Sequence, residues 1–258
     1  MCFNAFTAVS QGGFYDYPQP DGSPFQLRLT LEGVSADSEI TRSASEAPLV
    51  LLSQVHGTQV LAAAQAARYP QKDEADGLFI RPGDVTCGLR FADCAPVVIL
   101  SHSEAPWLLA LHSGFQGTLD NIAAAGMKLA RSLCGTPDPA GLYAWVGPCI
   151  CEKCYSRRRD DPATSEALRR FVPEACAARG DLVLFDLKRQ IAGQLLDLGV
   201  PHGHVYLESQ CTFENEELFY SHRRWARRKE GTDRRMLLTV KTKNELDDVI
   251  IKRKTAYF

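Results

Sequence analysis

Six short apolar runs, each bounded by turn residues, place the strongest constraint on what this chain can fold into. They are residues 48–55, 96–100, 107–111, 142–146, 204–208 and 236–240. Runs of about four to eight apolar or β-branched residues between turn signals are typical of buried strands. With 258 residues, of which 45% are hydrophobic, the chain is long enough to bury a large core. The pattern therefore predicts a sheet-rich protein with a substantial interior.

Helical periodicity between these runs predicts two regular helices and one less regular helix. The regular ones cover residues 118–135 and residues 185–200, the second beginning at the N-cap residue Asp186. The third lies near residues 163–179 and contains Pro173. The apolar stripe expected on the first helix is Ile122, Ala125, Leu129 and Leu133. Because strands and helices do not alternate cleanly, we expect one mixed domain, entered through a loop-rich N-terminal part over residues 1–47.

Composition excludes several function classes. The net charge of −2 does not favour a general nucleic-acid or membrane-surface binder. The sequence contains no apolar stretch of about 18 residues and no signal-like start, so we expect neither a membrane span nor export. Nine cysteines, an odd number, favour reduced thiols in a cytoplasmic protein.

The stretch "LRFADCAPVVIL", residues 89–100, places an acid and a thiol inside the most core-like part of the sequence. A buried aspartate must be paired or hydrogen-bonded, so Asp93 and Cys94 call for an explanation. His56 and His112 each follow another apolar run, and the ends of neighbouring strands can meet at one sheet edge. Two histidines and a cysteine could hold zinc with one open position. They could equally form a metal-free Cys–His nucleophile.

The segment that follows His112 could serve an anion. "HSGFQGTLDNI" runs from a strand through Gly114 and Gly117 into a helix start. Such a turn can present backbone amides to a phosphate or carboxylate, but a plain strand-to-helix turn also needs glycine. Basic groups in residues 221–224 and 233–235 could face the same anion or only solvent.

Three further cysteines, Cys149, Cys151 and Cys154, lie within six residues of one another. A closed zinc site needs four ligands, and no second cysteine pair stands at a matching spacing. Cys176 or Cys211 could supply a fourth ligand only by folding back. We therefore expect Cys149 and Cys151 not to be ligands of a closed structural zinc.

Several motifs, in order, resemble the multicopper polyphenol oxidase (laccase-like) family, whose members include purine nucleoside phosphorylases. They span about residues 45–240 and read "QVHGTQV", "ADG", "ADCAPVVIL", "LHSGFQGT", "VGPCICEKCY", "FDL", "CTFENEELFYSHRR" and "RRML". The resemblance implies an α+β fold with mixed β-sheets packed between helices, in an α/β/β/α-like order, similar to the deamidase domain of the cytotoxic necrotizing factors. It leaves residues 241–258 as a C-terminal extension, dispensable for the chemistry.

The resemblance also implies the chemistry. It makes His56, Cys94 and His112 the zinc ligands and catalytic set, with copper as a less favoured metal, and Asp93 a neighbour that orients or charges the site. The implied activity is phosphorolysis of adenosine, inosine or methylthioadenosine, or deamination of adenosine, in a monomer or small homo-oligomer. The partners are a purine nucleoside and phosphate. The substrate contacts expected are Gln54, Asp93, Gly114, Gln116, Cys154 and Arg223.

This sequence departs from the family pattern beside His112. The family has tryptophan and arginine where this chain has Phe115 and Gln116. Losing an arginine there weakens phosphate binding, because a charge-assisted hydrogen bond is about twice as strong as a neutral one. Arg157 to Arg159 could restore positive charge. A metal-free cysteine hydrolase or amidase using Cys94 and His112, a copper polyphenol oxidoreductase and a non-catalytic binding protein are the alternatives.

Overall fold

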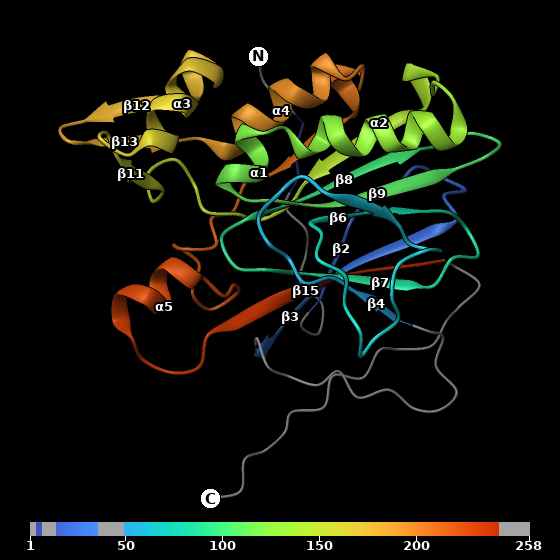
Figure 1. The fold of residues 1–258 in the computed structure, drawn as a ribbon, viewed down its shortest axis with the longest axis horizontal. Helices are drawn as coiled ribbons and strands as arrows, with labels where there is room; N and C mark the ends of the chain where they lie inside the picture. The colour runs from blue at the N-terminus through green and yellow to red at the C-terminus, as the bar shows by residue number, and fades with distance from the viewer. Residues whose placement is uncertain (1–3, 7–13, 36–48, 243–258) are drawn as a thin grey trace, which may run out of the picture.

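The computed structural model describes residues 4–6, 14–35 and 49–242 of the protein. In these ranges the chain builds three sheets and five α-helices (Figure 1). The helices are α1 (Phe115–Leu119), α2 (Ile122–Cys134), α3 (Pro162–Arg170), α4 (Leu187–Asp197) and α5 (His222–Arg228). No helix within the described ranges is both long enough and apolar enough to cross a bilayer.

The central layer is a seven-stranded mixed sheet. Its strands, in spatial order, are β1 (Asn4–Phe6), β14 (Val205–Glu208), β10 (Leu142–Val146), β8 (Ala95–Ser101), β9 (Trp107–Ser113), β6 (Gly77–Ile80) and β5 (Val60–Ala62). The pairs at either edge are parallel and the central ones are antiparallel. Helices α1, α2 and α4 cover one face of this sheet (Figure 1).

A five-stranded sheet covers the other face. Its order is β2 (Phe14–Asp16), β3 (Phe25–Ser35), β15 (Arg234–Thr242), β7 (Thr86–Phe91) and β4 (Leu49–Leu51). A small lobe carries the third sheet, in the order β11 (Ser156–Arg158), β13 (Leu182–Phe185) and β12 (Cys176–Arg179). The layers therefore run from helices to the seven-stranded sheet to the five-stranded sheet, and the expected α+β fold with mixed sheets is confirmed.

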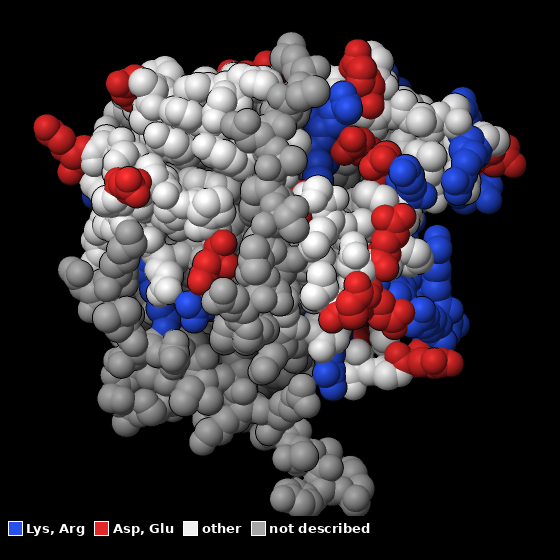
Figure 2. Space-filling view, turned by 180° about the vertical axis from the view of Figure 1, so that it is seen from behind, with Lys and Arg blue, Asp and Glu red and all other residues white. Residues whose placement is uncertain are grey.

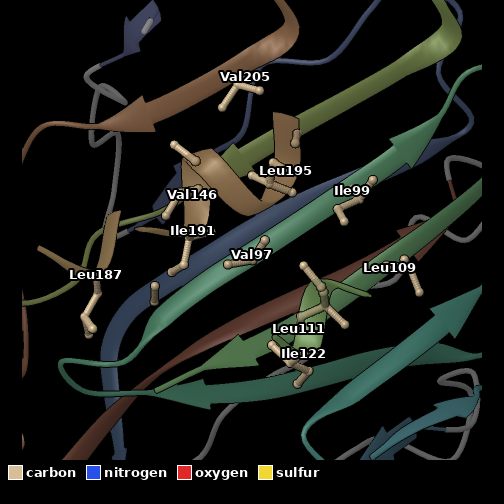
Figure 3. Packing of buried hydrophobic residues seen from close by; sticks show 14 of the residues in the cluster. Val97, Ile99, Leu109, Leu111, Ile122, Val146, Leu187, Ile191, Leu195 and Val205 are labelled. Atoms are coloured by element: carbon tan, nitrogen blue, oxygen red, sulfur yellow. The ribbon is translucent and has the colours of Figure 1, made fainter. Parts of the chain in front are cut away.

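The run at residues 96–100 is apolar throughout because both faces of β8 are buried. Val97 and Ile99 point into the core beneath the helices, seen in Figure 3. Val98 and Leu100 point into the second core, between the two sheets. Each side chain of this size contributes about 1.5–3 kcal/mol when removed from water. The central sheet is thus packed on both faces. Its strands hold the ends of their connecting loops in fixed positions.

The structure divides the helix expected over residues 118–135 into α1 and α2. Asn121 adopts the left-handed conformation, with φ of 59°, and its side chain accepts a hydrogen bond from the Ala124 amide. This side-chain cap starts a new helix and rotates its buried face. The expected stripe was wrong at its end, because Leu133 is exposed. The buried residues of α2 are Ile122, Ala123, Gly126, Met127 and Ala130.

Two other expectations need correction. The helix expected over residues 163–179 ends at Arg170, and the chain turns at Pro173 into β12. The loop-rich part expected over residues 1–47 contains β3, whose alternating residues Phe25, Leu27 and Leu29 are buried. The expected helix over residues 185–200 is confirmed as α4, with the Asp186 side chain accepting from the Arg189 amide. Of the extension at 241–258, residues 243–258 lie outside the described residues.

Candidate metal centre

His56, Cys94 and His112 converge at one end of the two large sheets. His56 lies in the loop after β4, Cys94 lies directly before β8, and His112 lies near the end of β9. One ligand atom from each residue can be chosen so that all three atoms lie within 4.8 Å of one another. The two imidazole rings meet edge to face, with their centroids 4.9 Å apart. The three side chains thus form one group able to hold a metal ion, as their positions at strand ends suggested.

A fourth residue, Asp76, holds two of the three ligands in place. Its carboxylate is fully buried, and its Oδ1 lies 2.8 Å from His112 Nδ1. Its oxygens also accept from the amides of Val55, His56 and Gly57, at 3.2, 2.9 and 2.7 Å. The bond to Nδ1 leaves the Nε2 of His112 for a metal, which is how carboxylates orient zinc-binding histidines. The amide bonds hold the His56 loop, where His56 itself has a φ of 63°.

Close packing accounts for both glycines that follow His112. A Cβ on Gly114 would lie 2.9 Å from Cys94 Sγ and 3.2 Å from His56 Cδ2. A Cβ on Gly117 would lie 3.3 Å from the Gly57 carbonyl oxygen. A side chain at Gly114 would therefore occupy the space between the ligands. Gly114 is the N-cap of α1, a helix of only five residues.

Cys94 and His112 form a strongly coupled acid–base pair. Burial alone would raise the pKa of the Cys94 thiol, but the charge of His112 and hydrogen bonds with both histidines lower it to about 6. Burial alone would lower the pKa of His112, but Cys94 and Asp76 raise it to about 9. Between these values the pair holds one proton. Such a thiolate is ready both as a metal ligand and as a nucleophile.

The three side chains open into a basic cavity of about 590 Å³. Figure 2 shows Lys and Arg gathered, among acidic residues, on the side of the molecule that carries α5 and the small lobe. Two of the lining arginines come from these elements, Arg157 from β11 and Arg223 from α5. The lining residues are Gln54, His56, Arg90, Ala92, Asp93, Cys94, His112, Phe115, Gln116, Tyr155, Arg157, His222, Arg223 and Arg235.

Two arginine–aromatic stacks form one wall of the cavity. The Arg157 guanidinium lies 4.3 Å from the centre of the Phe115 ring, and that of Arg223 lies 4.6 Å from the Tyr155 ring. The pKa of Arg223 lies below its usual range because burial, with the charges of Arg227 and Arg157, outweighs the attraction of nearby anionic groups. An anion bound here would relieve that repulsion. The wall therefore combines apolar ring faces with positive charge.

Gln54 and Asp93 line the cavity, but their polar atoms are held by the protein. The amide of Gln54 forms two hydrogen bonds with the backbone of Arg90, each 2.8 Å long. Asp93 accepts from Thr212 Oγ1 at 2.8 Å and from the Arg223 amide at 2.7 Å. Both residues are thus suited to positioning neighbouring loops. Asp93 ties the Cys94 turn to α5, which supports the expected orienting role.

The other expected substrate contacts are placed differently. Gln116 and Arg223 line the cavity, although Gln116 also donates to Asp120 at 2.6 Å. Gly114 and Cys154 are not among the lining residues. The Cys154 thiol instead lies 3.5 Å from Glu214 Oε1, in a second cluster with Cys151 and Cys211.

Sequence reasoning gave no role to two residues of this site. Asp76 belongs to the motif "ADG", for which sequence reasoning gave no role. Like Asp93, it is an acid next to an apolar strand, and such a position indicates a buried carboxylate that needs hydrogen-bond partners. Arg90 lies on a strand that reads as core, and only the fold shows that it reaches the cavity. Of the basic groups in residues 221–224 and 233–235, which could face an anion or only solvent, His222, Arg223 and Arg235 line the cavity.

Comparisons with known proteins show which family and which fold this chain shares. Purine nucleoside phosphorylase YlmD from Geobacillus stearothermophilus is 31% identical over 76% of this chain and 73% of the relative. Adenosine deaminase RL5, from an unknown prokaryotic organism, is 26% identical over 86% of this chain and 83% of the relative. The crystal structure of YlmD from Geobacillus stearothermophilus matches with a TM-score of 0.75 at 24% identity, covering 91% of this chain and 98% of that chain. Residues 32–241 match the model of the family described as multi-copper polyphenol oxidoreductase laccase, and the chain therefore belongs to that family.

Proposed function

We propose that the protein is a zinc-dependent purine nucleoside phosphorylase that acts on adenosine, inosine or methylthioadenosine in the cytoplasm. The observation that carries the proposal is the convergence of His56, Cys94 and His112 at one end of an arginine-lined cavity. The names of the relatives, purine nucleoside phosphorylase and adenosine deaminase, support the substrate class.

The residues present fit a zinc ion. Two imidazoles and a thiolate are ordinary zinc ligands, and three protein ligands leave one position open. Asp76 orients His112 for this purpose, and Gly114 leaves room between the ligands. When bound, zinc would supply a Lewis acid to the ligand in its open position. Copper is the less favoured metal, because a blue-copper centre uses a weak axial methionine, whereas Met127 and Met236 are fully buried in the two cores.

The cavity wall suits the two substrates of phosphorolysis. The stacked pairs give the wall apolar ring surface for a purine and, from Arg157 and Arg223, positive charge for phosphate. In the reaction a phosphate oxygen forms a bond to C1′ as the bond from C1′ to the purine nitrogen breaks. The purine leaves with the bonding electrons and takes up a proton, and ribose 1-phosphate is the second product. The arginines hold phosphate in line with C1′ and stabilise its charge.

Adenosine deamination is the second activity, favoured by the relative named adenosine deaminase and by the open position that three protein ligands leave. In it, water adds to C6 of the purine and ammonia leaves, so no phosphate is consumed. A metal-free hydrolase would instead use the Cys94 thiolate as nucleophile and His112 as its acid–base partner, which their shared proton would allow.

A product screen with metal analysis separates these reactions. Purified protein is assayed for zinc and copper and is incubated with adenosine, inosine and methylthioadenosine, with and without phosphate. Phosphorolysis predicts free base only when phosphate is present, together with ribose 1-phosphate from adenosine or inosine and methylthioribose 1-phosphate from methylthioadenosine. Phosphate-independent inosine and ammonia from adenosine would indicate deamination. Hydrolysis of a nucleoside that continues after a chelator has removed the metal would overturn the metal-dependent proposal in favour of the cysteine hydrolase.

A further inference from the structure

A second group of potential metal ligands lies outside the cavity. Cys151 and Cys154 belong to the loop between β10 and β11, and Cys211 and Glu214 follow β14. One ligand atom from each of these four residues can be chosen so that all lie within 4.8 Å of one another. Cys211 is one of the two cysteines considered above as a fourth zinc ligand. With Glu214, the group contains four possible ligands. Cys176 lies elsewhere, in β12.

The four residues come from two turns of similar form. The sequences are Cys-Glu-Lys-Cys at 151–154 and Cys-Thr-Phe-Glu at 211–214. In the first turn the Tyr155 amide donates to the Cys151 carbonyl at 2.9 Å, and in the second the Asn215 amide donates to the Cys211 carbonyl at 3.1 Å. Each turn therefore brings its first and fourth side chains together. In the second turn a glutamate, Glu214, stands where a second cysteine pair would have its second cysteine. The sequence therefore contains one Cys-x-x-Cys pair here and not two.

Two sulfur–oxygen distances, one to each oxygen of the Glu214 carboxylate, are close to the spacing of ligands in a zinc site. With bonds of about 2.3 Å to sulfur and about 2.1 Å to oxygen, neighbouring sulfur and oxygen ligands lie about 3.6 Å apart. Here Glu214 Oε2 lies 3.8 Å from Cys151 Sγ, and Oε1 lies 3.5 Å from Cys154 Sγ. The Cys151 amide also donates to Cys211 Sγ at 3.3 Å.

The two turns are already joined to each other and to the cavity. The Thr212 amide donates to the Cys149 carbonyl at 3.2 Å, and Thr212 Oγ1 donates to Asp93, the neighbour of Cys94. Arg223 donates to the Cys154 carbonyl at 3.3 Å, and Tyr155, the next residue, lines the cavity. A metal at this cluster would fix one wall of the cavity without touching the substrate.

We propose that Cys151, Cys154, Cys211 and Glu214 bind a second, structural zinc ion that joins two loops behind the cavity wall. The three thiols give up their protons to buffer when zinc binds. The geometry replaces the expectation that Cys151 is not a zinc ligand, and it leaves Cys149, which is fully buried, outside the set.

The test is zinc stoichiometry in protein purified with reductant and loaded with zinc. We expect about two zinc ions per chain in wild type, about one in Cys154→Ser, about one in Cys94→Ala, and about two in the control Cys176→Ser, whose thiol lies outside both clusters. About one ion in wild type, retained in Cys154→Ser, would overturn the proposal. One ion kept in Cys94→Ala and lost in Cys154→Ser would support this site while contradicting the zinc of the proposed function.

A measurement on wild type keeps the proposal testable even if Cys154→Ser does not fold. X-ray absorption at the zinc edge reports the average number of sulfur ligands per zinc. Because one site offers three sulfurs and the other offers one, two filled sites predict an average of about two. An average of about one, with one zinc per chain, would place all the metal at Cys94 and overturn the proposal.

Discussion

Replacing Asp76 with asparagine removes the charge that holds the His56 loop and the His112 ring together. Four N–H groups donate to this carboxylate, at 2.7 to 3.2 Å. An asparagine keeps one acceptor oxygen, so whichever way its amide turns, two of the four donors face an NH₂ group. Each lost bond to a buried charged acceptor costs about 1.5–3 kcal/mol. We therefore expect the zinc-free protein to lose roughly 3–6 kcal/mol of unfolding free energy.

Zinc affinity should fall as well, because Asp76 orients one ligand and positions the loop of another. Loss of such a supporting carboxylate typically weakens metal binding about 10- to 100-fold. Affinity is measured by competition with a chromophoric chelator in the Cys154→Ser background, which isolates the site of His56, Cys94 and His112. Stability is measured by urea unfolding of the zinc-free protein.

Asp73→Asn is the matched control for this experiment. Among the described residues, the Asp73 carboxylate accepts one amide hydrogen bond, from Ala67 at 2.8 Å, and it bonds to neither His56 nor His112. The control should lose some stability and keep its zinc affinity. If folded Asp76→Asn bound zinc within about two-fold of wild type, the reasoning about ligand orientation would be refuted.

Three further outcomes are expected. Gln116→Arg should lower the apparent KM for phosphate with inosine saturating, because it adds a charge to the cavity lining; an unchanged KM would mean that this position does not face the anion. In Cys154→Ser, which isolates the first site, zinc binding should release about one proton from the Cys94–His112 pair between pH 6 and 9, fewer at higher pH and more at lower pH. Calorimetry in buffers of different ionisation enthalpy measures this release, and a value near zero at pH 7 would contradict the shared proton. Deleting residues 244–258 should leave kcat within a few-fold of wild type, and a folded but inactive truncation would show that these residues serve catalysis.

The grouping of the three candidate metal ligands could be predicted from sequence because each interrupts or follows an apolar run. Cys94 and His112 lie at neighbouring ends of β8 and β9, whereas His56 lies in the loop between β4 and β5, because the strand expected over residues 48–55 ends at Leu51. The strands themselves were predictable for a related reason. In a run such as Val97 to Leu100, alternate side chains point into two different cores, so every residue of the run is apolar.

The supporting residues could not be predicted in the same way, because their partners lie far along the chain. Asp76 reads as a polar residue before a strand, and its bonds to His112 and to the His56 loop exist only in the folded protein. Cys211 and Glu214 lie about 60 residues from the cysteines they approach. Local spacing rules find ligands within one turn, whereas here each turn supplies half of the set.

The break between α1 and α2 shows a limit of periodicity. Residues 118–135 keep a helical pattern through Asp120 and Asn121, and helix propensity alone favours one continuous helix. Asn121 instead takes the left-handed conformation and caps a second helix with its side chain. The hydrogen bond from the Ala124 amide to the Asn121 side chain therefore overrides the local preference for one continuous helix.

The most direct test of the central claim is the zinc dependence of base release from inosine in the presence of phosphate. Wild type is stripped of metal, zinc is restored in steps, and hypoxanthine and ribose 1-phosphate are quantified together. The proposed function predicts that both products appear in equal amounts as zinc is restored, disappear when phosphate is omitted, and are absent in Cys94→Ala at every zinc level. Base release that persists in the stripped protein, or that continues in folded Cys94→Ala, would contradict it.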